Sequence, residues 1–170
     1  SRIILKMNTL TDEKLMEALV HAGQAGVQID LIIRGACMLP AQRPGVTDNI
    51  RVRSIIGRFL EHSRVFYFRT GNDESLYLSS ADWMNRNMLR RVELAWPVED
   101  AALRQRVIDE CLVAYLHDNV DAWSLNADGQ YTRVQPAKPK RASSKTTQPT
   151  TPVPLHGAQA ALMALYAAKL

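Results

Sequence analysis

Residues 60–87, LEHSRVFYFRTGNDESLYLSSADWMNRN, have the pattern of two short strands that pair through a tight turn. The apolar and aromatic run at 65–68 predicts the first strand, and residues 76–78 predict the strand that returns. Gly71 begins the Gly-Asn-Asp sequence between them, which is typical of a hairpin turn. The segment therefore predicts a β-hairpin around which the rest of the chain is arranged.

The ends of this hairpin carry polar residues. His62 comes just before the first strand, where we expect a preceding helix to end, and Arg64 follows it closely. Ser80 and Asn85 lie in the small and polar segment after the second strand. Because such residues do not complete a hydrophobic core, the ends of the hairpin are a candidate site.

The start of the chain predicts a parallel strand–helix–strand unit. Residues 2–7 predict a strand, apolar residues at helical spacing predict a helix up to about Gln24, and residues 27–33 predict a second, fully buried strand. Ligands of such units bind beyond the carboxyl ends of the strands. Arg34 directly follows the second strand, so it is a further candidate site residue.

Two elements are expected on either side of the hairpin. Thr47 or Asp48 caps a helix that runs to the hairpin. The apolar stripe of this helix consists of Val52, Ile55, Ile56, Phe59 and Leu60. After the hairpin, residues 90–97 predict a strand that its final proline ends.

The last part of the core is expected to contain one more helix and an edge hairpin. Apolar residues between Leu103 and Tyr115 recur at helical spacing. Residues 123–125 and 131–134 predict the two strands of the hairpin. The expected fold class is α/β, with a mixed, largely parallel sheet flanked by helices.

The composition changes after residue 135. Residues 136–156 are rich in proline, lysine, serine and threonine, and we expect a disordered linker because they cannot bury enough apolar surface. Residues 157–170 are alanine-rich and predict a short C-terminal helix that docks on a partner or frays. We therefore divide the chain into a domain at 1–135, a linker and a terminal helix.

The overall composition limits the choice of partner and compartment. The 170 residues can bury one sizeable core, and a net charge of +4 favours anionic partners such as nucleotides, polyphosphate or nucleic acid. Two cysteines without metal-ligand spacing indicate a reducing compartment, and no apolar run reaches the ~20 residues of a membrane span. We expect a cytoplasmic protein. Its abrupt start within an apolar run leads us to expect a piece of a longer chain.

The candidate residues suit phosphate chemistry. Histidine can attack phosphorus or donate a proton to a leaving oxygen, because it titrates near neutral pH. Arginine donates two hydrogen bonds to phosphate from its planar fork. The proposed cluster consists of Arg34, His62, Arg64, Ser80 and Asn85. No set of residues has the spacing of a metal site, so we assign no metal ligand.

The same motifs carry a family resemblance. His62-Ser63-Arg64, followed by residues 79–87, resembles the His-x-Lys and Gly-Ser-x-Asn pattern of the phospholipase D superfamily, with Arg64 in the place of the lysine. The chain is more similar to the last catalytic domain of the long-chain polyphosphate kinases. That resemblance rests on four runs in order: Ile33 to Cys37, Asp48 to Arg51, Leu60 to Val65 and Tyr77 to Met84.

The resemblance implies a reaction and a division of roles. Such kinases reversibly transfer the terminal phosphate of ATP to polyphosphate through a phosphohistidine, which would lie in a preceding domain. Arg34 and His62 match nucleotide and phosphate contacts, and His62 is the candidate catalytic residue, as proton donor or second phosphate contact. Mg²⁺ would assist, with ligands outside this chain, and this piece alone would be inactive.

The resemblance also implies the partners. These are ATP or ADP and inorganic polyphosphate, with a homo-oligomer for the full-length protein and no nucleic acid. Peripheral association with a membrane is compatible with this family.

Other interpretations remain open at this point. A phosphodiesterase of the phospholipase D superfamily would use a similar histidine but would carry lysine where Arg64 stands. A non-catalytic module that binds anions or nucleic acid would explain the charge alone. Ser79, Ser80 and Asp82 would serve only as caps if a helix began at Trp83. His62 would then be an ordinary surface histidine. Arg34 would only mark the point at which the chain leaves a buried strand.

Overall fold

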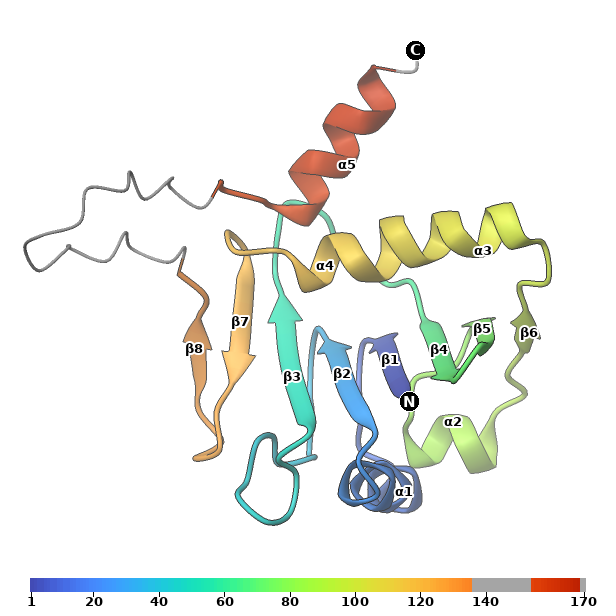
Figure 1. Ribbon diagram of the computed structural model, residues 1–170, viewed down its shortest axis with the longest axis vertical. Helices are drawn as coiled ribbons and strands as arrows, with labels where there is room; N and C mark the ends of the chain where they lie inside the picture. Colours follow the sequence, from blue (N-terminus) through green and yellow to red (C-terminus); the bar gives the residue numbers. More distant parts are fainter. Residues whose placement is uncertain (136–153, 169–170) are drawn as a thin grey trace, which may run out of the picture.

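The computed structural model describes residues 1–135 and 154–168. One eight-stranded sheet crosses it in the order β6-β5-β4-β1-β2-β3-β7-β8 (Figure 1). The strands are β1 (Arg2–Met7), β2 (Gln28–Ile33), β3 (Ile50–Ile55), β4 (Val65–Thr70), β5 (Asp73–Ser79), β6 (Ala95–Pro97), β7 (Ala122–Leu125) and β8 (Tyr131–Arg133). The helices are α1 (Glu13–Gln24), α2 (Asn85–Arg90), α3 (Ala101–Val107), α4 (Ala114–Leu116) and α5 (Ala158–Ala167). A π-helical segment, Ile108–Val113, joins α3 to α4.

The sheet is mixed, as expected, but the expectation that it is largely parallel was wrong. Only β1–β2 and β2–β3 are parallel, and the other five neighbouring pairs are antiparallel. A parallel pair needs a long crossover connection, which α1 and the loop after β2 supply. The β4–β5 and β7–β8 connections are hairpins, whose strands must run antiparallel.

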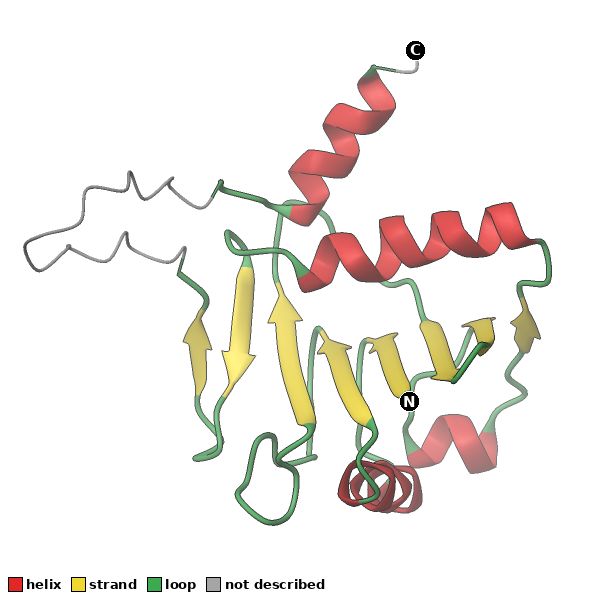
Figure 2. Cartoon of the chain, in the orientation of Figure 1, coloured by secondary structure: helices red, strands yellow, loops and turns green. Residues whose placement is uncertain are grey.

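Helices cover both faces of the sheet (Figure 2). On one face, Leu5 and Leu31 are fully buried in a cluster that includes Leu19 of α1. On the other face, Ile4 and Ile32 pack in a second cluster with Leu112 and Tyr115 of the long α3–α4 helix. Adjacent residues of β1 and β2 thus belong to opposite clusters, because successive side chains of a strand point to opposite faces.

The helix expected from residue 47 or 48 to the hairpin is wrong. Residues 50–55 form β3 instead, and an irregular loop, residues 56–64, follows it. Ile50 and Val52 are buried while Arg51 between them is exposed, which is the alternation of a strand. The apolar residues of the loop have helical spacing, but Ile56 and Leu60 are exposed. His62 therefore lies in a loop and not at the end of a helix.

The other predictions for the core are largely confirmed. The strand at 2–7, the helix that ends at Gln24, the hairpin around Gly71 and the edge hairpin all form. The strand expected at 90–97 is shortened to β6, and α2 precedes it. Within the parts that the structure describes, no helix is long and apolar enough to cross a membrane.

The expected terminal helix forms as α5. Its first turn packs on the core, where Ala158 is fully buried, and its far end points away from the sheet (Figure 1). The expected linker at 136–156 falls mostly on residues 136–153, which lie outside the described residues. Its last residues are described, and the Pro154 carbonyl accepts a hydrogen bond from Asn119 Nδ2 at 3.0 Å.

Candidate functional site

The candidate residues gather at one edge of the sheet. β1, β2 and β3 are parallel, so their carboxyl ends lie at the same edge, where Asn8 follows β1 and Arg34 follows β2. β4 begins at this edge after Arg64, and β5 ends there before Ser80. This is the part of an open sheet at which ligands bind.

Arg34 is held by the side chain of Asn8. Its Nε and Nη2 donate to Asn8 Oδ1 at 2.9 and 2.6 Å, and its own carbonyl accepts from Ser54 Oγ at 2.8 Å. The side chain is half-buried beside a hollow of about 460 Å³ that Gly35 and residues 55–60 also line. The guanidinium is therefore fixed at the wall of an open hollow, as an anion-binding group should be.

Arg64 lies between Asp82 and His62. Its Nε donates to Asp82 Oδ1 at 3.0 Å, and its Nη2 donates to Asp82 Oδ2 at 3.2 Å. The same Nη2 lies 3.0 Å from His62 Nε2. Because a guanidinium has no acceptor, Nε2 must accept, and the ring hydrogen is then on Nδ1.

Asp82 joins the end of β5 to the end of β1. Its Oδ1 accepts from the backbone N–H of Asn8 at 2.8 Å and of Thr9 at 3.4 Å. Burial alone raises the pKa of this carboxyl, but the hydrogen bonds from Arg64 and Asn8 outweigh burial and hold the pKa below its usual value. Asp82 is thus a buried carboxylate with structural partners.

The capping hypothesis for Ser79, Ser80 and Asp82 was wrong. α2 begins at Asn85 after Met84, and no side chain caps it. Asp82 instead bonds to the end of β1, 74 residues earlier in the chain. The polar residues after β5 thus connect strands and do not start a helix.

One continuous chain of hydrogen bonds results from these contacts. It runs from Arg34 through Asn8 and Asp82 to Arg64 and His62. Three of the five residues named from the sequence belong to it.

Ser80 and Asn85 lie elsewhere. Ser80 Oγ bonds to Glu93 and accepts from the backbone N–H of Leu94 at 3.0 Å, so its hydroxyl ties down the segment before β6. Asn85 is exposed at the start of α2, in a separate hollow that Thr11 also lines. The structure thus does not place these two residues in the hydrogen-bonded chain.

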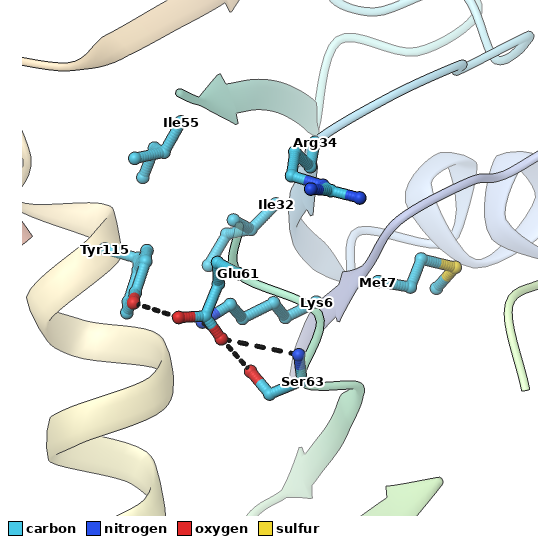
Figure 3. Close-up of a pocket in the computed structure, with 8 residues that line it drawn as sticks. All are labelled: Lys6, Met7, Ile32, Arg34, Ile55, Glu61, Ser63 and Tyr115. Atoms are coloured by element: carbon cyan, nitrogen blue, oxygen red, sulfur yellow. Dashed lines mark hydrogen bonds and ion pairs between the residues drawn. The ribbon is translucent and has the colours of Figure 1, made fainter. Parts of the chain in front are cut away.

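A partly buried ionic cluster anchors the loop that carries His62 (Figure 3). Glu61 accepts from Tyr115 Oη at 2.6 Å and from Ser63 Oγ at 2.5 Å. Lys6 Nζ lies 3.2 Å from Glu61 Oε1 and 3.3 Å from the centre of the Tyr115 ring. Figure 3 shows the guanidinium of Arg34 pointing away from the Glu61 carboxylate.

The ionisation of this cluster follows from its contacts. Burial alone raises the pKa of Glu61, but the charge of Lys6 and the hydrogen bonds from Ser63 and Tyr115 hold the pKa at about 2. Burial lowers the pKa of Lys6, and the charge of Glu61 offsets part of that change. Burial and the bond to Glu61 raise the pKa of the Tyr115 hydroxyl. Glu61 is therefore a carboxylate at neutral pH.

Asn8, Asp82 and the Lys6–Glu61 pair were not predicted from the sequence to be parts of the site. Asn8 could have been found, because it follows β1 as Arg34 follows β2. Lys6 was also visible as a charge inside the apolar run IILKM. The contact between Asp82 and the backbone of Asn8 had no such signal, because the two residues are 74 positions apart.

The residues near the site do not fit a magnesium ion. Asp82 uses both oxygens on Arg64, and Glu61 is occupied by Lys6, Ser63 and Tyr115. Within the described residues, no group of three or more histidine, cysteine, aspartate or glutamate side chains could hold a metal. The cationic groups at this edge are instead suited to bind an anion.

The fold and site together define an α/β domain with two arginines and a histidine at the edge of the sheet where its parallel strands end. The family model described as "Polyphosphate kinase C-terminal domain 2" matches residues 1–145, and the chain belongs to this family. The resemblance found in the sequence motifs is thereby confirmed.

Relatives and a solved structure agree with this assignment. The polyphosphate kinase of Pseudomonas aeruginosa is 59% identical over 136 residues, which cover 80% of this chain and 20% of the relative. That of Paraburkholderia phytofirmans is 52% identical over 141 residues, 83% of this chain and 20% of the relative. The chain thus spans about a fifth of the length of these relatives.

The crystal structure of polyphosphate kinase from Porphyromonas gingivalis has the same fold. It superposes with a TM-score of 0.83 at 36% identity, over 99% of this chain and 24% of that one. The match supports the arrangement of the sheet and helices as a family feature.

Proposed function

We propose that this chain forms one side of the active site of a polyphosphate kinase, which transfers the terminal phosphate of ATP to inorganic polyphosphate. The observation that carries the proposal is the hydrogen-bonded chain from Arg34 to His62 at the edge of the sheet. It fixes two guanidinium groups and one imidazole at this edge of the sheet, and the guanidinium of Arg34 lies at the wall of an open hollow. Phosphoryl transfer depends mainly on such fixed positive and hydrogen-bonding groups.

The proposal gives each group a task. Arg34 faces the hollow and binds a phosphate oxygen there. Arg64 turns the imidazole of His62 so that Nδ1–H is the group available to a phosphate oxygen. His62 then supports the developing charge or gives its proton to the leaving oxygen, while the phosphorylated histidine belongs to another part of the longer protein.

The proposal includes the setting of the enzyme. ATP or ADP and polyphosphate are its substrates, it acts in the cytoplasm, and the chain alone does not turn over. Magnesium would be held by residues elsewhere in the longer protein, because the carboxylates here already have partners.

The test compares this chain with the longer protein that contains it, in an assay of ATP-dependent polyphosphate growth. We expect synthesis by the longer protein only. Synthesis by the isolated chain would contradict the requirement for a second half of the site. Hydrolysis of a phosphodiester by the longer protein, without polyphosphate growth, would favour phospholipase D chemistry instead.

A further inference from the structure

Gln159, at the start of α5, clamps the loop that lines the candidate site. The side chain is only 6% exposed. Its Oε1 accepts from the backbone N–H of Phe59 at 2.8 Å, and its Nε2 donates to the carbonyl of Phe59 at 3.0 Å. One side-chain amide thus satisfies both backbone groups of a loop residue that lies 100 positions earlier in the chain.

The start of α5 is held in place without help from the loop. The backbone N–H of Ala158 donates to Asp118 Oδ2 at 2.7 Å, and that of His156 donates to Asn119 Oδ1 at 2.8 Å. Asp118 is buried, and its Oδ1 accepts from the backbone N–H of Asp121 at 2.7 Å. Gln159 therefore projects toward the loop from a fixed position.

The loop is built to admit this amide. A Cβ atom at Gly57 would lie 2.6 Å from Gln159 Oε1 and 3.2 Å from Asp121 Oδ2. Any side chain at Gly57 would push Gln159 away. Gly57 thus leaves the space that the buried amide of Gln159 occupies.

The clamped loop connects the hollow to His62. Its residues 56–60 line the hollow beside Arg34, and its other end is anchored through Glu61. Phe59 and Leu60 are 50% and 83% exposed, so apolar packing does not hold this part of the loop. The Gln159 hydrogen bonds supply an anchor at the middle of the loop.

We propose that Gln159 is a positioning residue for the candidate site: it keeps the loop in the shape that presents the hollow to a polyanionic substrate. The family model ends at residue 145, so Gln159 lies outside the residues that this model matches. The inference rests on the proposed function of the site. Its physical basis is preorganisation, because a loop that is ordered before binding does not have to be ordered by the substrate.

The variant Gln159→Leu removes both hydrogen bonds at similar volume, and Gln159→Glu keeps the acceptor but loses the donor. Tyr166→Phe is the matched control on the same helix, because Tyr166 contacts Arg106 and Glu110 of the neighbouring helix. Each variant is made in the longer protein that contains this chain. The readouts are the hydrogen-exchange rate of the Phe59 amide, and KM for polyphosphate separately from kcat.

For Gln159→Leu we expect exchange at Phe59 to be roughly tenfold faster and KM to rise roughly tenfold, the effect of losing about one hydrogen bond. kcat and the melting temperature should change little, Gln159→Glu should be intermediate, and Tyr166→Phe should match the wild type. An unchanged KM in Gln159→Leu would overturn the proposal. So would an equal rise of KM in Tyr166→Phe, which would indicate a general effect of helix docking.

Failure of the Gln159 proposal can be distinguished from failure of the proposed function. If the wild-type longer protein makes no polyphosphate, the proposed function fails and the Phe59 exchange rate decides whether Gln159 holds the loop. Equal exchange in wild type and Gln159→Leu overturns the clamp in either case. Should Gln159→Leu not fold, Gln159→Glu and Gly57→Ala decide with the same readouts, since both disturb the clamp and leave the anchored start of α5 in place.

Discussion

Arg64 holds His62 and Asp82 at once, with 3.0 Å between its Nη2 and His62 Nε2 and 3.0 Å between its Nε and Asp82 Oδ1. The two partners differ in exposure: Asp82 is buried and His62 is exposed. Arg64 therefore has a structural contact with Asp82 and a second contact with His62, a candidate site residue. Substitutions should separate the effect on stability from the effect on activity.

His62→Ala tests the exposed side of this arrangement. Because His62 is exposed, we expect a change of stability within about 0.5 kcal/mol. Polyphosphate synthesis by the longer protein should fall by roughly 10² to 10⁴, the usual range for a group that transfers a proton. His117→Ala is the control, because His117 is also exposed but lies at the end of α4. Near-normal synthesis by His62→Ala would reject His62 as a site residue.

Arg64→Leu tests the buried side. It leaves the Asp82 carboxylate without its counter-ion, which for a buried pair costs about 3–5 kcal/mol of stability. Arg104→Leu breaks a comparable pair with Glu74 whose side chains are 24% and 33% exposed, so we expect a loss of about 1 kcal/mol or less. Urea unfolding of both variants measures the difference. Equal losses would show that the burial of Asp82 does not matter.

The sequence predicted the parts of the fold whose patterns are local. β1, α1 and β2 differ clearly in apolar spacing, and the β4–β5 hairpin is marked by its turn. β3 was missed because Ile55, Ile56, Phe59 and Leu60 happen to have helical spacing. What decides its structure is non-local: β3 pairs with β2 on one side and β7 on the other.

The candidate site was predictable to a similar extent. Arg34 and His62 could be named because each adjoins a predicted strand. The contacts of Asp82 with Asn8 and of Gln159 with Phe59 could not be assigned, because they join residues 74 and 100 positions apart that only the folded structure brings together. A local motif indicates which residues are candidates for the site, and the tertiary structure shows which groups they contact.

Acid should destabilise the protein partly through Glu61. Its pKa is about 2 in the folded state against an ordinary value of 4.5, so the unfolded state binds more protons between these values. The contribution of the ionised Glu61 to the free energy of unfolding is therefore complete above about pH 4.5 and is lost as the pH falls toward 2. Asp82, whose pKa is also lowered, acts in the same direction. Urea unfolding from pH 6 to pH 2 should show a shallower acid loss for Glu61→Gln than for the wild type, and equal slopes would contradict this account.

A double-mutant cycle on Lys6 and Glu61 tests whether the cluster behind the His62 loop acts as one unit. Lys6→Met keeps most of the packing volume but leaves Glu61 without its counter-ion, and Glu61→Gln leaves a buried ammonium over the Tyr115 ring. We expect each single change to cost about 2 kcal/mol, less than for a fully buried pair, because the Glu61 side chain is 27% exposed. In the double variant the new glutamine can still accept from Tyr115, so the losses should not add, and we expect a coupling of about 1–2 kcal/mol.

Urea unfolding of the four proteins at pH 7 gives this coupling energy directly. Additive losses would mean that Lys6 and Glu61 stabilise the protein independently and do not act as one unit behind the loop that carries His62.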